Sequence, residues 1–421
     1  MKKTIAIIGA GASGMAAAIA AARAAERNSA EVEIVLLERM PRVGKKILST
    51  GNGRCNLSNA LILPEHYHSQ NPRELEEAVA GSSAEEVIEF FEKAGLMCER
   101  GDGGRIYPLC NQASMVLDIL LRELERYGVS AECGFEACCA KKAGSRFDIT
   151  ASDGRKISAD AVIFAAGGKA SPSLGSDGSG FELLKKFGHT LAPLYPCLVP
   201  VKADSGFVKA LKGIKTTCRA TLCKSGRALA SEVGEILFTD YGLSGIPIMQ
   251  LSCLMSDRMA DAAYSVELDL LPKSRTEELE ARIAKHRSLY PNEILEQLLL
   301  GTINKKLGFM VLKSAGIYPL SRRVGELSDI EITAIARALK SLGFELSGTL
   351  SWNQAQVTGG GILLREVDTR TMQSKKMSGA YICGELLDIA GDCGGYNLHW
   401  AWLSGMRAGT AAAESLLESV R

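Results

Sequence analysis

The sequence predicts an α/β protein in which one domain is built from both ends of the chain. An apolar run at residues 5–8, a glycine-rich turn at 9–14, a helix-forming stretch and a second apolar run at 32–37 follow one another. That order predicts strand, turn, helix and strand. Glycine-rich patterning of the same kind returns near the C-terminus, after a middle part with different periodicity. These two observations define the fold class.

The turn at residues 9–14 has the spacing of a dinucleotide-binding motif. Gly9 permits a tight turn, Gly11 lets the backbone approach a pyrophosphate, and Gly14 lets the helix pack closely against the strand. The phosphates would then meet the free N–H groups and the positive end of the helix dipole. Glu38 follows the second strand, where a carboxylate can accept hydrogen bonds from ribose hydroxyls. The alternative is an ordinary strand–helix–strand corner, and we favour dinucleotide binding because strand, helix and acid are in register.

A polar loop follows, because two glycines, three asparagines and an arginine at residues 51–59 exclude a strand or helix interior. Such a loop can present backbone N–H groups to an anionic ligand, and the alternative is a solvated surface loop. Residues 72–96 are expected to form a helix broken near Gly81, and residues 113–127 an amphipathic helix. The apolar run at 161–165 predicts a buried strand.

The middle of the chain is patterned differently. Short alternating segments between about 195 and 271 predict a β-rich domain. Many lysines and arginines between 202 and 227 would suit a nucleic-acid-binding surface, but no aromatic side chains interleave with them, so a solvated strand face is favoured. Ser328 is expected to cap a helix. Helical segments are expected at 276–287, 292–300, 302–315 and 328–342.

Glycine-rich α/β patterning resumes at residues 355–361 and continues through a predicted strand at 380–383, which ends at Gly384-Glu385. Gly394-Gly395 then leads into a final helix of about 401–420 and offers a second helix N-terminus to an anion. We therefore expect three domains: a discontinuous one of residues 1–193 and 349–421, a β-rich one of 194–272 and 344–348, and a helical insert of 273–343.

Composition limits the class of function. The 421 residues carry a net charge of +1, so no overall field favours nucleic acid or membrane. The cysteines lack zinc-ligand spacing, and no metal site is expected. No uncharged apolar stretch approaches the roughly 20 residues of a membrane helix. Lys2-Lys3 and the alanine-rich stretch after them resemble a secretory signal, but three glycines interrupt that stretch, and we expect a cytoplasmic protein.

The motifs at Gly9–Gly14 with Glu38, Ala165–Gly168 and Gly384-Glu385 resemble those of two-dinucleotide-binding-domain flavoproteins, which bind FAD. Further stretches are similar to one bacterial family of NAD(P)/FAD-dependent, aminoacetone-oxidase-like proteins, which includes a 3-dehydro-bile-acid Δ4,6-reductase branch. These stretches are Ser49–Asn59, Gly234–Gly245, Val357–Gly361 and Gly394–Trp402. The resemblance covers essentially the whole chain and implies a Rossmann-like, discontinuous FAD domain, an inserted β-barrel-like domain and a helical insert.

The resemblance also implies a cofactor site. Gly11–Gly14 would hold the pyrophosphate, Glu38 the adenosine ribose and Glu385 the ribityl chain, while Gly395–Asn397 and the following helix would meet the N1–C2=O edge of the flavin. The expected cofactor-binding residues are Gly9, Gly11, Ala12, Ser13, Gly14, Glu38, Arg39, Lys45, Gly51, Asn52, Gly53, Arg54, Cys55, Ala137, Ala166, Gly167, Gly384, Glu385, Gly394, Gly395, Tyr396 and Asn397.

Three side chains are expected near the substrate and are candidate catalytic residues: Arg105, Tyr241 and His399. Packing is the alternative for each of them, and Trp400 and Trp402 beside His399 are typical of a packing site. Many members of the family carry a histidine where this chain has Asp240. A general-acid role is therefore not transferred to that position.

The expected function is that of an FAD-dependent oxidoreductase, which transfers a hydride between flavin N5 and a small organic substrate. Reduction of a steroid- or bile-acid-like enone is the most concrete version. The alternatives are an amine or aldehyde oxidase that uses O₂, an RNA-modifying or RNA-binding flavoprotein, and a flavin-binding sensor. The sequence shows no second nicotinamide-binding unit, and NADH or NADPH is a candidate electron donor. We expect no nucleic-acid or membrane partner.

Overall fold

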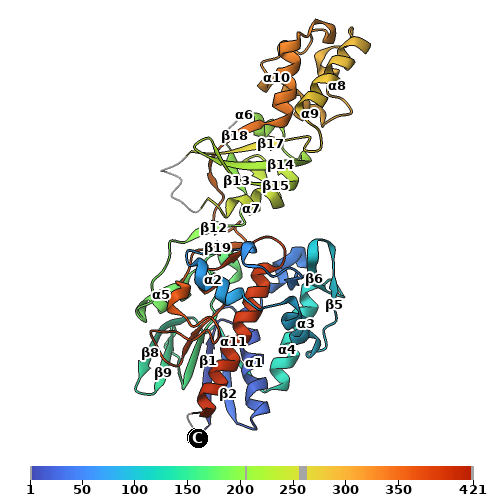
Figure 1. Ribbon diagram of the computed structural model, residues 1–421. Coiled ribbons are helices and arrows are strands. Elements are labelled where there is room, and N and C mark those ends of the chain that lie inside the picture. The colour runs from blue at the N-terminus through green and yellow to red at the C-terminus, as the bar shows by residue number, and fades with distance from the viewer. Residues whose placement is uncertain (1, 204–205, 256–262, 419–421) are drawn as a thin grey trace. The chain divides into compact units, whose positions relative to one another are not determined.

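The computed structural model describes residues 2–203, 206–255 and 263–418 (Figure 1). The chain divides into two compact units, one of Met1–Cys197 with Trp352–Arg421 and the other of Leu198–Ser351. The first unit therefore contains both ends of the chain. The finer division of the second unit into a β-rich domain and a helical insert stays a prediction. Within the described ranges, no helix is both long and apolar enough to cross a membrane.

A five-stranded parallel sheet forms the centre of the first unit, in the strand order β20–β11–β1–β2–β7. Its strands are β1 (Lys3–Ile8), β2 (Val32–Glu38), β7 (Ser130–Cys133), β11 (Ala161–Phe164) and β20 (Ala380–Ile382). Most are continuous apolar runs because both faces of a parallel sheet are covered. Since all five strands point the same way, Gly9, Glu38, Ala165 and Cys383 lie along one edge. This arrangement confirms the predicted Rossmann-like fold.

Two long helices of this unit, α1 (Ala12–Arg27) and α11 (Tyr396–Glu418), pack side by side (Figure 1). A β-carbon on Gly405 would lie 2.3 Å from the Ser13 carbonyl oxygen, and one on Gly409 would lie 2.0 Å from the Ala17 carbonyl oxygen. Both contacts run in the same chain direction, so the helices are parallel. Their N-termini consequently lie at the same end of the pair.

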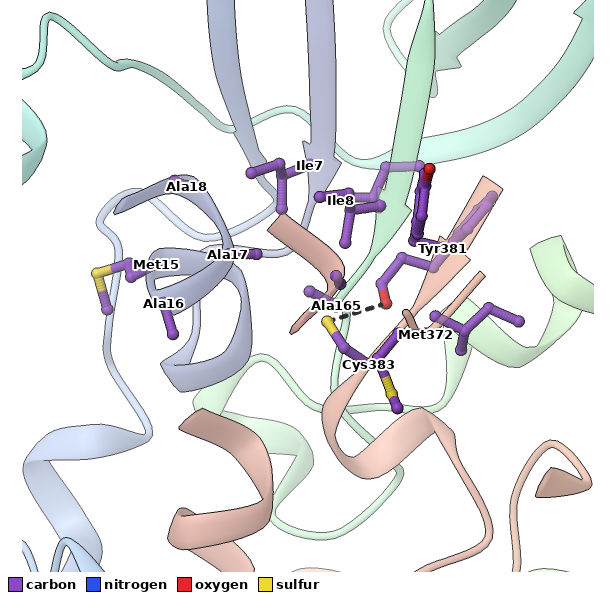
Figure 2. Packing of buried hydrophobic residues seen from close by; sticks show 14 of the residues in the cluster. Ile7, Ile8, Met15, Ala16, Ala17, Ala18, Ala165, Met372, Tyr381 and Cys383 are labelled. Carbon is purple, nitrogen blue, oxygen red and sulfur yellow. Dashed lines mark hydrogen bonds between the residues drawn. The ribbon is translucent and has the colours of Figure 1, made fainter. Parts of the chain in front are cut away.

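The hydrophobic core of this unit fills the space between the sheet and these helices. Figure 2 shows Ile7 and Ile8 of β1 close to Ala17 of α1, all of them buried. On the other side of β1, the Cys383 thiol donates to the Phe164 carbonyl oxygen over 3.7 Å. The alanines of α1 allow its backbone to come close to both the sheet and α11, because they add little volume.

Replacing Gly409 with alanine is expected to lower the free energy of unfolding by about 1–3 kcal/mol, the usual cost of overpacking a filled core. The added methyl group would fall on the Ala17 carbonyl oxygen and push α1 and α11 apart. Urea unfolding followed by circular dichroism measures the change. Thr410→Ala, at the neighbouring half-buried position, is the control and should change stability by no more than about 0.5 kcal/mol. Equal stability of G409A and the parent would show that α1 and α11 pack less closely than the structure indicates.

Smaller sheets and shorter helices complete the first unit. Its other strands are β3 (Ser58–Asn59), β4 (Tyr67–His68), β5 (Cys98–Arg100), β6 (Arg105–Pro108), β8 (Ala137–Ala143), β9 (Arg146–Ala151), β10 (Lys156–Ala159), β12 (Tyr195–Cys197), β19 (Val357–Gly359) and β21 (Ala390–Gly391). They pair as β10–β9–β8, β3–β6–β5, β12–β19 and β21–β4. Its other helices are α2 (Pro72–Val79), α3 (Ala84–Glu92), α4 (Ala113–Arg126) and α5 (Ser179–Lys186). The helix break predicted near Gly81 is confirmed.

The second unit contains a closed barrel with the strand order β13–β16–β15–β14–β17–β18. Its strands are β13 (Val201–Ala203), β14 (Lys215–Lys224), β15 (Arg227–Phe238), β16 (Gly242–Ser244), β17 (Tyr264–Asp269) and β18 (Leu342–Thr349). Alternate side chains fill the interior, as Cys218, Ala220 and Leu222 do on β14. The expected β-barrel is confirmed.

Helices of the second unit are α6 (Gly206–Ala210), α7 (Ile246–Ser252), α8 (Thr276–Leu289), α9 (Lys305–Ser314) and α10 (Asp329–Lys340). The predicted N-cap is confirmed, since the Ser328 hydroxyl accepts a hydrogen bond from the Glu331 N–H. The helix predicted at 292–300 is wrong, because that segment forms only one 3₁₀ turn at Leu295–Gln297. The Leu295 N–H donates to the Arg322 carbonyl oxygen instead, so pairing with a distant segment replaces the helical bond.

Candidate cofactor and substrate site

The glycine turn between β1 and α1 has the geometry of an anion site. Gly9 has a φ of 104°, in the region that favours glycine, and a β-carbon on Gly14 would lie 1.9 Å from the Gly9 carbonyl oxygen. A β-carbon on Gly11, by contrast, would meet nothing within 4 Å. Gly11 is also the N-cap of α1 and has no side chain to cap the first helical N–H groups. Open space therefore faces N–H groups that lack an intrahelical partner, which suits a phosphate.

Glu38 lies at the carboxyl end of β2, next to this turn. Its Oε2 accepts a hydrogen bond from the Ala10 N–H over 2.9 Å, and its Oε1 accepts one from the Met40 N–H over 2.8 Å. Two backbone donors thus hold the carboxylate in place. Each oxygen keeps a further lone pair, so the group can still accept hydrogen bonds from ribose hydroxyls.

Three other expected cofactor-binding residues lie near the end of β2 or in the following loop, and their contact with the cofactor stays a prediction. Arg39 forms ion pairs with Asp177 and Glu136, and the hydrogen bond to Asp177 raises the pKa of Arg39. Ala137 begins β8 directly after Glu136. Lys45 donates through Nζ to the Ser173 carbonyl oxygen over 2.8 Å. Arg39 and Lys45 are therefore already held by protein groups.

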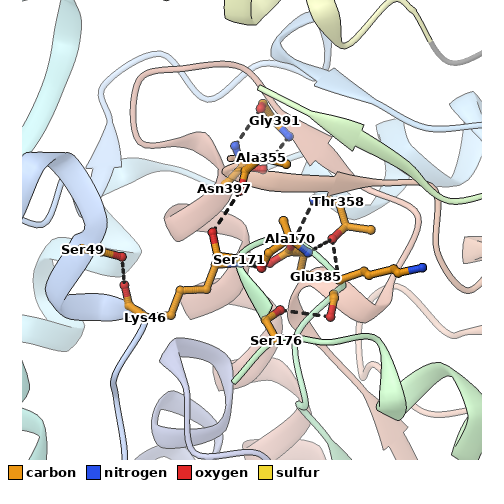
Figure 3. Close-up of polar contacts among 12 residues, drawn as sticks. Lys46, Ser49, Ala170, Ser171, Ser176, Ala355, Thr358, Glu385, Gly391 and Asn397 are labelled. Carbon is orange, nitrogen blue, oxygen red and sulfur yellow. Dashed lines mark hydrogen bonds and ion pairs between the residues drawn. The ribbon is translucent and has the colours of Figure 1, made fainter. Parts of the chain in front are cut away.

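A polar network joins the end of β20 to the segment after β11 (Figure 3). Glu385 accepts hydrogen bonds from Lys46 Nζ and from the Thr358 N–H, each over 2.8 Å. The Thr358 hydroxyl oxygen accepts from the N–H groups of Lys169 and Ala170 at 2.7 and 2.9 Å. Glu385 was expected from the sequence, whereas Lys46 was missed. A loop lysine gives no sequence signal for a carboxylate partner 339 residues away.

The expected polar loop adopts an unusual backbone. Gly51–Gly53 all have φ between 55° and 81°, and Cys55 has a φ of 58°. Consecutive residues of this kind can turn their N–H groups toward one anion. Arg54 is exposed, with its guanidinium 4.6 Å from the centre of the Tyr107 ring and donating to the Tyr107 hydroxyl over 3.3 Å. Burial raises the pKa of Cys55 to about 12, so its thiol stays protonated.

The polar loop, the β5–β6 hairpin and the turn before α11 converge in the first unit. Asn59 joins them, because its Nδ2 donates to the carbonyl oxygens of Gly103 at 3.2 Å and Gly394 at 3.0 Å. A β-carbon on Gly395 would lie 2.2 Å from the Ser58 carbonyl oxygen, so the turn before α11 rests on the polar loop. The polar loop, the β5–β6 hairpin and this turn therefore form one polar surface.

The last helix starts earlier than predicted, and this brings the turn into the site. α11 begins at Tyr396 rather than near residue 401. The Asn397 side chain closes the turn, because its Oδ1 accepts from the Gly391 N–H over 2.8 Å and its Nδ2 donates to the Gly391 carbonyl oxygen over 2.7 Å. The positive end of α11 therefore lies directly behind Gly394 and Gly395.

His399, a candidate catalytic residue, is 1% exposed. Its Nδ1 lies 2.9 Å from the Ser58 hydroxyl, and its Nε2 has no hydrogen-bond partner among the described residues. Burial, with a smaller contribution from the charge of Arg407, lowers the pKa of His399 to about 3. Its imidazole is therefore neutral at neutral pH. A proton-transfer role for His399 stays a prediction that this environment does not favour.

Arg105 is half-buried at the start of β6, opposite Asn59. Burial raises the pKa of Tyr396 to about 12, and the charge of Arg105 opposes that rise. The His66 ring stacks on Tyr396 with ring centres 4.5 Å apart, and Tyr67 meets it edge-on at 5.7 Å. His66 and Tyr67 were not predicted, because they lie in a stretch without a motif.

Tyr241 and Asp240 belong to the second unit. Tyr241 is half-buried at the turn between β15 and β16, where its carbonyl oxygen accepts from the Ala203 N–H over 3.0 Å. Asp240 is exposed and pairs with Lys212 Nζ over 2.7 Å, and this hydrogen bond lowers the pKa of Asp240. Asp240 is thus an ionised surface carboxylate. The catalytic role of Tyr241 stays a prediction.

The residues of the first unit fit a bound FAD. Open space at Gly11 faces the N-terminus of α1, and Glu38 keeps lone pairs for a ribose. Asn56 Oδ1 is buried without a partner among the described residues, and it lies 2.9 Å from the position of a β-carbon on Gly395. These three features match the parts of a long dinucleotide. The N-terminus of α1 suits the phosphates and Glu38 suits a ribose, while Asn56 Oδ1 beside the N-terminus of α11 needs a hydrogen-bond donor. The described residues contain no His, Cys, Asp and Glu group that could hold a metal.

This fold and site define a Rossmann-like FAD-binding protein of the FAD-dependent oxidoreductase class. The chain belongs to the HI0933-like protein Rossmann domain family, whose sequence profile matches residues 3–411. This assignment confirms the family resemblance that the motifs indicated.

Two curated relatives and one solved structure are similar to the chain. The 3-dehydro-bile acid delta(4,6)-reductase of Clostridium scindens is 38% identical over 414 residues, which cover 97% of this chain and 99% of that protein. The ribosomal RNA dihydrouridine synthase of Haemophilus influenzae is 29% identical over 406 residues, covering 94% and 95%. The structure of 3-ketosteroid delta1-dehydrogenase from Sterolibacterium denitrificans aligns with a TM-score of 0.48 at 12% identity, covering 98% of this chain and 100% of that one.

Proposed function

We propose that the protein reduces the conjugated carbonyl system of a small organic molecule, in particular a steroid- or bile-acid-like enone. One observation carries the proposal, which is the 38% identity over 97% of the chain to a protein named 3-dehydro-bile acid delta(4,6)-reductase. FAD, when bound, supplies the hydride for such a reduction. The protein must then orient the enone, polarise its carbonyl group and provide a proton.

The first unit offers groups to hold each part of the cofactor. The N-terminus of α1 would take the pyrophosphate and Glu38 the adenosine ribose. The Lys46–Glu385 pair would meet the ribityl hydroxyls, because a carboxylate accepts and an ammonium donates. The N-terminus of α11 would place its positive end against the N1–C2=O edge of the flavin.

The converging loops offer donors for the substrate. The Arg105 guanidinium and the backbone N–H groups of Gly51–Cys55 belong to this polar surface. Donors that point at a carbonyl oxygen stabilise the negative charge that develops there during hydride transfer. We propose NADH or NADPH as the source of electrons and a cytoplasmic location.

The proposal is tested by anaerobic stopped-flow spectroscopy in two steps. NADH and NADPH are first compared as donors by the bleaching of the flavin absorbance. The reduced protein is then mixed with a panel of enones and steroids, and at least one of them should reoxidise the flavin. If the reduced protein reacts only with O₂, the reductase proposal fails and an amine or aldehyde oxidase becomes the leading alternative.

Substituting Arg105 with alanine or Tyr241 with phenylalanine is expected to slow flavin reoxidation by the enone about 10²–10³-fold, the usual cost of losing one preorganised donor. FAD content should not change, because neither residue is among the expected cofactor-binding residues. Arg100→Ala, on the neighbouring strand β5, and Tyr290→Phe, on an exposed tyrosine, are matched controls. If the flavin of R105A and Y241F is reoxidised at the parent rate, both residues have only a packing role.

RNA modification is a second candidate function. A relative at 29% identity is named a ribosomal RNA dihydrouridine synthase, and β14 and β15 carry the exposed cations Arg219 and Arg227. Two other cations of this region are already paired, Lys212 with Asp240 and Lys215 with Glu235, which weakens the case. Retention on an RNA matrix that falls steeply with salt would support this candidate. No retention at low salt would exclude it.

A further inference from the structure

Asp392 bridges two histidines of the first unit. Its Oδ2 lies 3.2 Å from His66 Nδ1, and its Oδ1 lies 2.9 Å from His68 Nε2. The antiparallel pairing of β4 with β21 holds these residues together, and the Asp392 N–H donates to the His66 carbonyl oxygen over 2.9 Å. An ionised carboxylate only accepts hydrogen bonds, so His66 Nδ1 and His68 Nε2 must each carry a hydrogen. The opposite nitrogens, His66 Nε2 and His68 Nδ1, are left to exchange a proton.

These three side chains lie at the candidate site and also reach water. The His66 ring stacks on Tyr396, the first residue of α11, and Asp392 precedes the Gly394-Gly395 turn. The side chains of His66, His68 and Asp392 are 28%, 27% and 19% exposed. A proton taken from this group can therefore be replaced from solvent.

No other histidine in the described parts of the chain combines these properties. His399 is buried and neutral. His189 is also buried, between Glu366 and Ser374, and burial lowers its pKa. His286 is partly exposed and pairs with Glu293 over 2.9 Å, but it belongs to the helices of the second unit.

The neighbouring groups do not compete for the proton near neutral pH. Tyr396 stacks on His66, and Tyr67 packs edge-on against Tyr396. Burial raises the pKa of both phenols, so both stay protonated. The charged groups that face this cluster are Glu65, directly before His66, and Arg105 on β6, both of which act on Tyr396. Their charges oppose each other.

We propose that His66, His68 and Asp392 form the proton-supply group of the reductase, with the transferable proton on His66 Nε2. The inference rests on the proposed function. Reduced FAD, when bound, would supply a hydride for a new C–H bond at the conjugated carbon, and the C=C electron pair would move to give an enolate. The proton released by the His66 imidazolium then protonates the enolate, so the enone gains two electrons and two hydrogens overall. Solvent returns a proton to His66.

The test is His66→Gln in the FAD-loaded protein. Reoxidation of the reduced flavin by the enone should slow about 100-fold at neutral pH, the lower end of general-acid effects. The parent rate should fall as pH rises, and the variant rate should not depend on pH in the same range. FAD content, unfolding temperature and chemical bleaching of the flavin by dithionite should be unchanged. His286→Gln is the matched control, since its side chain is also 28% exposed and paired with a carboxylate.

A readout without turnover is nitrogen NMR of histidine-labelled protein. The geometry requires neutral His66 to carry hydrogen on Nδ1 and neutral His68 on Nε2. Asp392→Asn should remove this preference at one of the two rings, because the amide oxygen accepts whereas the amide NH₂ donates. Equal reoxidation rates for H66Q and the parent, or the reverse tautomers in the parent, would overturn the inference. If no enone reacts, the proposed function fails instead. Flavin reoxidation by O₂ is then compared between the parent and H66Q, because O₂ takes two electrons and two protons to form H₂O₂. Equal rates of reoxidation in the two proteins would still overturn the inference.

Discussion

The Gly11→Val variant is expected to fold normally and to lose FAD. The new side chain meets no protein atom near its β-carbon, because a β-carbon at this position has nothing within 4 Å. It would instead fill the space in front of the first N–H groups of α1. Loss of two charge-assisted hydrogen bonds, at about 1.5–3 kcal/mol each, weakens binding by roughly 10²–10⁴-fold. Fluorescence titration of FAD into the deflavinated parent and variant measures this difference.

Substitutions at two further glycines distinguish a ligand-binding role of Gly11 from a packing role. Gly343→Val in β18 is the matched control, since a β-carbon there also meets nothing within 4 Å, and FAD affinity should be unchanged. Gly14→Ala should reduce both stability and FAD content, because its methyl group would strike the Gly9 carbonyl oxygen. Full FAD occupancy in G11V would rule out this turn as the pyrophosphate site.

Replacing Glu366 with alanine is expected to destabilise the protein by about 1–3 kcal/mol, the cost of leaving partly buried hydrogen-bond donors without their acceptor. The carboxylate is 11% exposed and accepts hydrogen bonds from Lys376 Nζ at 2.9 Å and from the Thr190 N–H and hydroxyl at 2.8 and 2.7 Å. His189 Nδ1 lies 3.1 Å from it, and the other ring nitrogen lies 2.8 Å from the Ser374 hydroxyl. Urea unfolding measures the loss.

The exposed pair of Glu182 and Lys185 supplies the control for that experiment. Glu182 is 67% exposed, so Glu182→Ala should change stability by no more than about 0.5 kcal/mol. A similar small change in E366A would mean that the Glu366 network does not hold the segments around His189 and Ser374 together.

The contribution of Glu366 depends on pH in a defined direction. Burial alone would raise the pKa of Glu366, but hydrogen bonds from Lys376, Thr190 and His189 outweigh it and lower the pKa to about 2. A depressed pKa stabilises the folded state above the ordinary value near 4.5, and this stability is lost as pH falls toward 2. The stability difference between the parent and E366A should therefore shrink between about pH 4.5 and 2. A constant difference across that range would contradict the assignment.

The cofactor half of the site was largely predictable because its requirements are local. The spacing of Gly9, Gly11 and Gly14 reflects what the backbone of one turn requires. In the structure, Gly14 lies too close to Gly9 for a side chain, and Gly11 faces open space. Glu38 could be found in the same way, since the acid directly ends a strand of the same βαβ unit. Their contacts with FAD stay predictions.

The rest of the candidate site depends on contacts that no local pattern reveals. Lys46 pairs with Glu385, and His66 and His68 pair with Asp392, across more than three hundred residues of sequence. Local periodicity also failed at 292–300, where the Leu295 N–H pairs with a distant carbonyl instead of continuing a helix.

The sequence by itself determined the βαβ unit, because glycine spacing and apolar periodicity are properties of neighbouring residues. The family followed from the resemblance of several motifs, and the profile match over residues 3–411 confirms it. Only the tertiary structure decided which ionisable side chains meet. It made His399 a buried, neutral ring and gave His66 and His68 a shared carboxylate with access to water. Protonation depends on burial and on the charges nearby, and both are set by segments that the fold, not the order of residues, brings together.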